Sequence, residues 1–121
     1  GWYLPAIGEW YDILENLGEV LMDEKFKTDE SLKSTQMLTG RMVDGIKAAN
    51  NINTKLRKAT SNGNVDEFDV TYYSSCQFWS SSECSSGCAR DMNFYNRGVL
   101  YVNSSGMTNT SSYRVRCVLA F

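Results

Sequence analysis

The side chains best suited to covalent or metal chemistry in this chain are its four cysteines, because the sequence contains no histidine. Without an imidazole, Ser–His and Cys–His nucleophile pairs cannot form, and the commonest zinc ligand is missing. A structural zinc site would need all four thiolates, but only Cys84 and Cys88 lie close together in the sequence. We therefore expect neither a metal site nor a cofactor.

The cysteines can also form disulfides, and four of them allow three complete pairings. Cys84 and Cys88 are separated by Ser-Ser-Gly, a short loop that could bring their Cα atoms within the ~7 Å that a disulfide needs. Cys117 has apolar neighbours in an expected terminal strand, so we expect it to be a buried small hydrophobe. Cys76 has no clear assignment.

Carboxylates are the remaining candidates for acid–base catalysis, and several fall near the expected strands. Almost any two carboxylates can be proposed as a pair, so this pattern has little specificity. We expect the chain not to be an enzyme, and keep a hydrolase using Glu83 and Asp91 as an alternative.

Tyrosine, asparagine and aspartate alternate with apolar residues where two strands are expected, over residues 89–95 and 99–103. Side chains alternate between the two faces of a strand, which separates an apolar set from a polar one. Tyrosines among short polar residues are typical of binding surfaces, because tyrosine gives a large contact area at low entropic cost. An ordinary solvated sheet face is the alternative. The expected inward set is Met92, Phe94, Leu100 and Val102, and the outward set is Asp91, Asn93, Tyr95, Val99, Tyr101 and Asn103.

Length and charge limit the classes of protein to consider. The chain has 121 residues, which is one domain's worth. Its 12 basic and 14 acidic residues give a net charge of −2, which argues against nucleic-acid binding and a polybasic membrane surface. No apolar run approaches the ~18 residues of a membrane span, so we expect no direct membrane insertion.

The first half of the chain has the spacing of amphipathic helices. Apolar residues three and four apart predict a helix over residues 7–21, with Pro5 in its first turn. A charged connection is expected over residues 23–33. Met42 to Ala49 predict a second helix, which residues 52–59 continue as a short third helix or an extension.

The second half has no lysine, because the last one is Lys58, and it begins with a turn signal at residues 61–64. Short strands are expected at residues 68–74, 78–81, 89–95, 99–103 and 113–120, with a hairpin loop at 96–98 and a polar loop at 104–112. Helices followed by strands indicate an α+β domain.

Four separated pieces of the chain carry a resemblance when taken together: Gly1–Pro5, Phe78–Glu83, Ala89–Phe94 and Tyr113–Val118. Their order and spacing resemble those of one family, the C-type-lectin-fold domain of gut-bacterial surface proteins named for the Fibrobacter succinogenes major paralogous domain. This resemblance implies a C-type-lectin-like fold, with helices in the N-terminal half and a small, mostly antiparallel twisted sheet with long loops in the C-terminal half. It also implies that residues 1–121 are a single domain, the C-terminal part of a longer exported protein at the bacterial cell surface or outside the cell.

The same resemblance suggests a function. A subset of the fold forms the variable proteins of diversity-generating retroelements, whose C-terminal stretch is mutated at adenines to diversify a binding face. Residues 84–112 are rich in the types that such mutagenesis produces, and Cys84 and Cys88 could be members of that variable set. We therefore expect a non-enzymatic, adhesin-like or receptor-binding domain with a protein or glycan ligand on another cell or particle. The oligomeric state is open, and a structural domain packed against its neighbours is the alternative. The expected ligand-binding residues are Cys84, Ser86, Cys88, Arg90, Asp91, Asn93, Tyr95, Asn96, Tyr101 and Asn103.

The shared motifs themselves are expected to be scaffold. Trp2, Phe78 and Trp79 are large enough for core positions. The serines at residues 80–82 are expected to form local backbone or cross-strand hydrogen bonds rather than to bind a ligand. Either Arg114 or Arg116 could pair with Glu83, in the manner of the family. Calcium-dependent sugar binding through a Glu-Pro-Asn or Gln-Pro-Asp triplet is not expected, because the only proline is at position 5.

Overall fold

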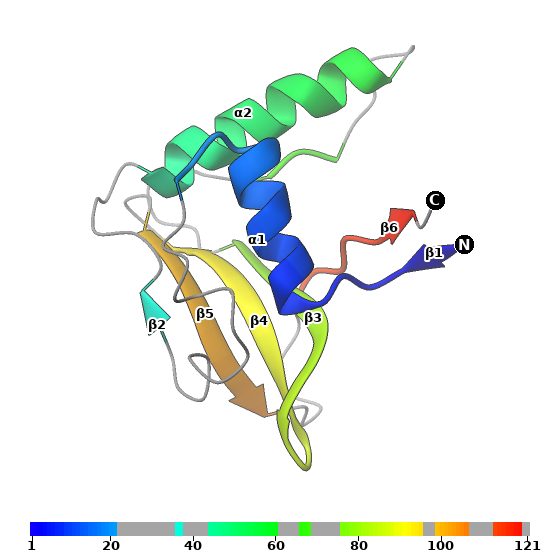
Figure 1. Ribbon diagram of the computed structural model, residues 1–121, viewed down its shortest axis with the longest axis vertical. Coiled ribbons are helices and arrows are strands. Elements are labelled where there is room, and N and C mark those ends of the chain that lie inside the picture. The colour runs from blue at the N-terminus through cyan, green and yellow to red at the C-terminus, as the bar shows by residue number, and fades with distance from the viewer. Residues whose placement is uncertain are drawn as a thin grey trace.

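A computed structural model describes residues 1–21, 36–37, 44–60, 66–68, 76–95, 99–106 and 113–119. Over these residues the chain forms a small α+β domain with two helices and two antiparallel sheets (Figure 1), as the order of the sequence patterns predicts. The elements are β1 (Trp2–Tyr3), α1 (Ile7–Asn16), β2 (Gln36–Met37), α2 (Asp44–Ala59), β3 (Cys76–Ser85), β4 (Cys88–Tyr95), β5 (Val99–Gly106) and β6 (Val118–Leu119).

Helix α1 forms where the apolar spacing predicts it, but it ends five residues earlier than expected. Ile7, Trp10 and Leu14 are buried on one side of the helix. At its start, the Ala6 N–H donates to a Glu9 carboxylate oxygen at 2.8 Å, where a negative charge also favours the positive end of the helix dipole. The last predicted member of the stripe, Leu21, is 94% exposed and outside the helix.

The end of α1 is fixed by contacts with α2. The Lys55 ammonium of α2 donates to the Asn16 and Leu17 carbonyls at 3.2 and 3.0 Å, which otherwise have no helical partner. It also bonds Glu19 at 2.8 Å, and this contact lowers the pKa of the Glu19 carboxyl. Glu19 has a φ of 57°, so the chain leaves the helix through a left-handed residue.

Gly18 allows this close approach of the two helices. A Cβ at this position would lie 2.6 Å from the Leu14 carbonyl oxygen and 3.0 Å from the Ala48 Cβ. We expect Gly18→Ala to lower the free energy of unfolding by about 1–3 kcal/mol, because neither backbone can easily move away.

Urea denaturation measures this effect, and Gly8→Ala is the matched control. Gly8 lies within α1 with nothing within 4 Å of an added Cβ, so alanine there should stabilise the protein by about 0.5–1 kcal/mol. Equal effects at the two glycines would contradict the close-approach explanation.

Helix α2 is one continuous helix from Asp44 to Ala59, so the predicted second and third helices are a single element and the extension alternative is confirmed. Ala48, Ala49 and Ile52 are buried on its inner side. The predicted connection at 23–33 and the predicted turn at 61–64 lie outside the described residues, as does the start of the predicted second helix.

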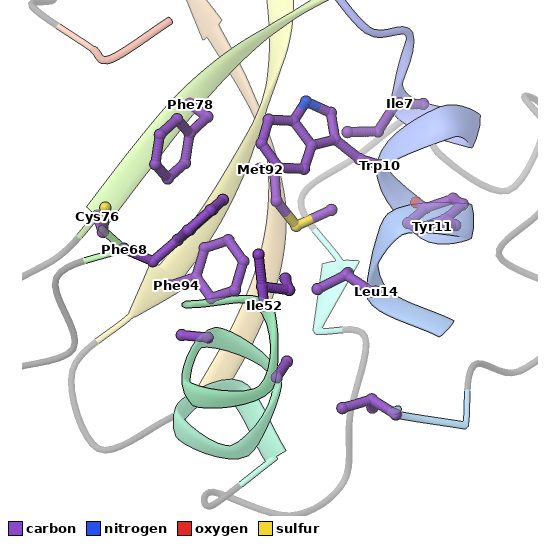
Figure 2. Close-up of a cluster of buried hydrophobic side chains, with 13 residues drawn as sticks. Ile7, Trp10, Tyr11, Leu14, Ile52, Phe68, Cys76, Phe78, Met92 and Phe94 are labelled. Carbon is purple, nitrogen blue, oxygen red and sulfur yellow. The ribbon is translucent and has the colours of Figure 1, made fainter. Parts of the chain in front are cut away.

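The core is built around an aromatic cluster between the helices and the main sheet (Figure 2). Phe68 lies at its centre, with ring centroids 6.3 Å from Trp10, 4.9 Å from Phe78 and 5.2 Å from Phe94. The structure therefore confirms the expected core roles of Phe78 and Phe94, which are both 2% exposed.

Phe68 belongs to a short stretch without regular structure, so the predicted strand is wrong at its first residue, and residues 69–74 lie outside the described part. The stretch is attached to α2 instead. Asn53 accepts the Phe68 N–H at 2.8 Å and donates to the Phe68 carbonyl at 3.0 Å. Arg57 forms an ion pair with Glu67 one residue earlier.

The main sheet has the strand order β2-β5-β4-β3, and all its pairs are antiparallel. Helix α1 packs over β3 and β4, and α2 packs over β4 and β5 (Figure 1). Strand β5 continues to Gly106, into the predicted polar loop, whose remainder at 107–112 lies outside the described residues. Strands β3 and β4 meet at a turn where Gly87 has a φ of 74°, the left-handed region that favours glycine.

The two chain ends lie side by side, because β1 and β6 form a separate two-stranded ribbon (Figure 1). Trp2 is 73% exposed, so its expected core role is wrong. Tyr3, beside it, donates to Glu9, and this hydrogen bond raises the pKa of the Tyr3 hydroxyl. Of the strand predicted over residues 113–120, the structure describes 113–119, and within these residues a named strand forms only at Val118–Leu119. Cys117 is an exposed free thiol, which corrects the prediction of a buried one.

Candidate functional site

The pairing of β4 with β5 brings the predicted outward residues together on one face of the main sheet. Directly opposite residues in an antiparallel pair point to the same face. Tyr95 and the residues of β5 are placed by backbone register alone, because their side chains lie outside the described atoms. The cross-strand pairs are Asp91–Asn103, Asn93–Tyr101 and Tyr95–Val99.

Strand β3 extends this set, since Gln77 lies opposite Asn93 and Trp79 lies opposite Asp91. We call the face that carries Gln77, Trp79, Asp91 and Asn93 the polar face. The opposite face carries Phe78, Met92 and Phe94, which all belong to the aromatic core. The predicted inward positions of Met92 and Phe94 are therefore confirmed, while the side chains of Leu100 and Val102 lie outside the described atoms.

Asp91 and Asn93 are buried, with exposed fractions of 0% and 6%, so the alternative of an ordinary solvated sheet face is wrong at both positions. Strand β4 is an inner strand with β3 on one side and β5 on the other, so neighbouring side chains can cover it. Gln77 of β3 does so, because its Nε2 donates to an Asp91 carboxylate oxygen at 3.3 Å. Strand alternation predicted the face but not whether that face is covered.

Asn93 has an unusual environment for a buried amide. Its Oδ1 is fully buried and has no hydrogen-bond partner. A buried acceptor left without a partner costs about 1–3 kcal/mol, so most such groups in folded proteins are bonded to protein or water. The described contacts of the fold therefore leave the Asn93 Oδ1 acceptor without a hydrogen bond.

An aromatic pair lies on the polar face beside Asp91. The ring centroids of Trp79 and Tyr113 are 4.6 Å apart, and both side chains are partly exposed. Tyr113 is held there because the next residue, Arg114, pairs with β3: its N–H donates to the Gln77 carbonyl at 2.9 Å, and its carbonyl accepts the Trp79 N–H at 3.0 Å.

Neither member of this pair was among the expected binding residues. Trp79 is expected in the core from its size, but it directly follows Phe78 in a strand, so the two side chains must point to opposite faces. That alternation was the signal available in the sequence for Trp79. Nothing in the sequence placed Tyr113 beside it.

The expected binding residues near the β3–β4 turn do not share one surface. Ser86 is exposed in the turn, whereas Arg90 is 6% exposed and lies on the opposite face from Asp91 by alternation. Cys88 is disulfide-bonded, and a bridge to Cys84 is the pairing that the short loop between them allows. The side chain of Cys84 and the whole of Asn96 lie outside the described part of the structure.

The serines at residues 80–82 bond backbone groups, and the expected cross-strand bond is confirmed for Ser80. Ser80 Oγ donates to the Arg90 carbonyl of β4 at 2.8 Å. Ser82 Oγ accepts the Ile7 N–H at the start of α1 at 2.9 Å. Between them, the Ser81 N–H donates to the Pro5 carbonyl at 3.0 Å. The bonds of Ser81 and Ser82 join the start of α1 to β3.

The two arginines near the C-terminus have partners other than the expected one. Arg114 donates to the Cys76 thiol at 3.3 Å, and the Arg116 guanidinium lies 4.9 Å from the centre of the Phe68 ring. Within the described part of the chain neither pairs with Glu83, so that expectation is wrong. Glu83 is an exposed residue opposite Ala89.

The described residues lack two other kinds of feature. They contain no group of three or more His, Cys, Asp or Glu side chains placed to hold a metal ion. In the same residues, no helix has the length and apolar composition required to cross a bilayer.

Comparison with known proteins yielded no match to this chain among family models, curated proteins or solved structures.

Proposed function

We propose that this protein is a non-enzymatic ligand-binding domain, adhesin-like or receptor-binding, whose binding surface lies on the polar face of the main sheet. The observation that carries the proposal is the β4–β5 register. It pairs Asn93 with Tyr101 and Asp91 with Asn103, so two tyrosine positions and three short polar residues are neighbours on one rigid sheet. Sites built on strands hold their side chains more accurately than sites on loops.

The proposed fold is C-type-lectin-like. Contacts between the four motif pieces support this: the Ser81 N–H donates to the Pro5 carbonyl, the Trp79 N–H donates to the Arg114 carbonyl, and Trp79 pairs with Asp91 of β4. Pieces far apart in the sequence thus form one framework along β3, as expected if their order and spacing specify a common scaffold. The pairing of the terminal strands β1 and β6 adds to this framework.

Binding is a better fit than hydrolysis to these contacts. A carboxylate pair must reach one substrate from two sides, whereas Glu83 is exposed and Asp91 is fully buried behind Gln77. The proposed ligand is a protein or glycan on another cell or particle, and the proposed location is outside the cell or on a bacterial surface. The disulfide at Cys88 suits such an oxidising location. Diversification of residues 84–112 is part of the same proposal.

A second candidate is a structural domain that packs against a neighbouring domain. It is favoured by apolar side chains exposed on and beside the β1–β6 ribbon, where Trp2, Val115 and Leu119 are 73%, 60% and 42% exposed. Exposed groups of this kind often mark interaction surfaces.

Binding of the labelled protein to a printed glycan array and to an array of extracellular proteins tests the proposal. We expect saturable binding on at least one array. The double variant Tyr95→Ala/Tyr101→Ala should weaken it at least about tenfold with an unchanged melting temperature.

Trp2→Ala is the matched control, because it removes an exposed aromatic side chain from the other sheet; it should leave binding unchanged. Absence of binding on both arrays, or full binding by the double variant, would overturn the proposal. If Trp2→Ala loses binding while the Tyr95→Ala/Tyr101→Ala double variant keeps it, the result would favour the second candidate.

A further inference from the structure

We infer that two copies of this chain associate through one side of the β1–β6 ribbon, and that a disulfide between their Cys117 thiols then holds the two copies together. The surface involved carries Trp2, Val115, Cys117 and Leu119, and we call it the terminal face. This inference goes beyond the proposed ligand binding, because the ribbon and the polar face belong to different sheets (Figure 1).

The exposure of side chains along the last described segment defines the terminal face. Val115, Cys117 and Leu119 are exposed, whereas the residues between them are half-buried. This alternation is the pattern of an extended chain with one side turned to solvent. Leu119 pairs directly with Trp2 of β1, so Trp2, which is 73% exposed, lies on the same side. Three apolar side chains and a thiol therefore share one exposed surface.

The charged groups of the same segment are turned the other way. The Arg116 guanidinium lies 4.9 Å from the centre of the Phe68 ring, and the Arg114 guanidinium donates to the Cys76 thiol at 3.3 Å. None of the four side chains of the terminal face is charged. Two copies can therefore bring this surface together without placing like charges opposite each other.

The order of residues on the terminal face matches a second copy of the same chain. Apolar residues lie two positions before and two positions after Cys117. In a pair related by a twofold axis the two segments run in opposite directions, so Val115 of each copy meets Leu119 of the other and the two Cys117 residues meet at the axis. Each apolar side chain then gains an apolar neighbour, and each thiol meets a thiol.

The small size of the terminal face explains the need for a covalent bond. A stable interface buries about 800 Å² on each partner, which is more than four side chains supply, so contact alone gives weak association. Cys117 is exposed and free, although Cys88 of the same chain is disulfide-bonded. In an exported protein, an exposed cysteine that has no partner in its own chain favours a bond between chains.

The bond forms by exchange with a small disulfide such as oxidised glutathione. The Cys117 thiolate of one copy attacks a sulfur of the small disulfide and releases one small thiol. The Cys117 thiolate of the second copy then attacks the Cys117 sulfur of this mixed disulfide and releases the second small thiol. Two protein thiols are thus oxidised to one disulfide, while one small disulfide is reduced to two thiols.

Incubation of the protein with a mixture of reduced and oxidised glutathione tests the inference, with samples separated over time on non-reducing gels. We expect a species of twice the monomer mass that a strong reductant converts back to monomer, and peptide mass spectrometry should find Cys117 linked to Cys117. Cys117→Ser should abolish this species, whereas Cys76→Ser, which removes the buried free thiol, should retain it. Formation of only the mixed disulfide with glutathione, or linkage through another cysteine, would overturn the inference.

Charged variants separate a specific interface from chance collision of exposed thiols. Val115→Asp should slow formation of the dimer at least about tenfold, because each carboxylate would lose water against an apolar side chain. The matched control is Leu21→Asp, which adds the same charge at an apolar site that is 94% exposed and outside the terminal face; it should dimerise at the wild-type rate.

An equimolar mixture of Val115→Asp and Leu119→Lys chains tests the direction of the pairing. The mixed dimer should form faster than either variant pairs with itself, because the two opposite charges then meet. A wild-type rate for Val115→Asp would show that the apolar surface plays no part and would overturn the inference. Absence of any dimer of the wild-type protein, the result expected if this surface packs against a neighbouring domain, would also overturn it.

Discussion

Replacing Phe68 with alanine is expected to lower the free energy of unfolding by about 3–5 kcal/mol, the range for removal of a fully packed aromatic side chain. Phe68 is 3% exposed and its ring contacts three other aromatic rings, those of Trp10, Phe78 and Phe94. Arg116 adds a cation over the same ring. Removal of the Phe68 ring would therefore leave a cavity between α1, α2 and the sheet. Equilibrium urea unfolding followed by tryptophan fluorescence measures the loss.

Phe68→Leu is the control for this experiment, because it keeps most of the apolar volume and loses mainly the aromatic contacts. We expect it to cost less than half as much as alanine. A cost for Phe68→Ala below about 0.5 kcal/mol, the level of ordinary surface changes, would show that Phe68 is not at the centre of the core.

The second large effect is expected at Asn53. Its side chain is 4% exposed and bonds both the N–H and the carbonyl of Phe68. Asn53→Ala would leave two buried backbone groups without partners, and we expect the free energy of unfolding to fall by about 2–4 kcal/mol. The same urea titration measures it.

Two variants make this result specific. Asn53→Asp retains the acceptor for the Phe68 N–H and loses the donor to the carbonyl, so its effect should differ from that of alanine. Asn50→Ala changes an exposed asparagine of the same helix and should shift stability by no more than about 0.5 kcal/mol. The double variant Asn53→Ala/Phe68→Ala should cost less than the sum of the single changes, because the two residues are in contact. Strict additivity would contradict the linkage.

The parts of this fold that could be predicted from the sequence are those with a local periodic signal. The stripe of Ile7, Trp10 and Leu14 predicted α1, and the alternation of Met92 and Phe94 with polar residues predicted β4 and the face of each side chain. The pairing of β4 with β5 followed from two alternating runs separated by a short Asn-Arg-Gly loop. These signals depend only on neighbouring residues, so one sequence is enough to read them.

What could not be predicted depends on which segment covers which surface. Asp91 and Asn93 have types that are normally exposed, yet they lie on an inner strand and are buried. Trp2 has a type that is normally buried, yet it lies on a two-stranded ribbon that leaves it 73% exposed. In each case, the exposure of the side chain depends on contacts between residues far apart in the chain.

The candidate site shows the same division. Its polar positions on β4 and β5 were predicted from alternation, but the Trp79–Tyr113 pair was not. That pair exists because Arg114 bonds to the edge of β3, which is a long-range contact without a sequence signal. Phe68 is a similar case: it resembles a strand residue by type, but Asn53 and the aromatic rings determine its position.

The pairing of β1 with β6 also determines how the domain would respond to mechanical force. In this antiparallel ribbon Trp2 pairs with Leu119 and Tyr3 with Val118, so both chain ends leave from the same side. Tension between the ends would break these pairs one after another instead of shearing them all at once. The ribbon would therefore extend at low force, before the load reached the aromatic core or the polar face.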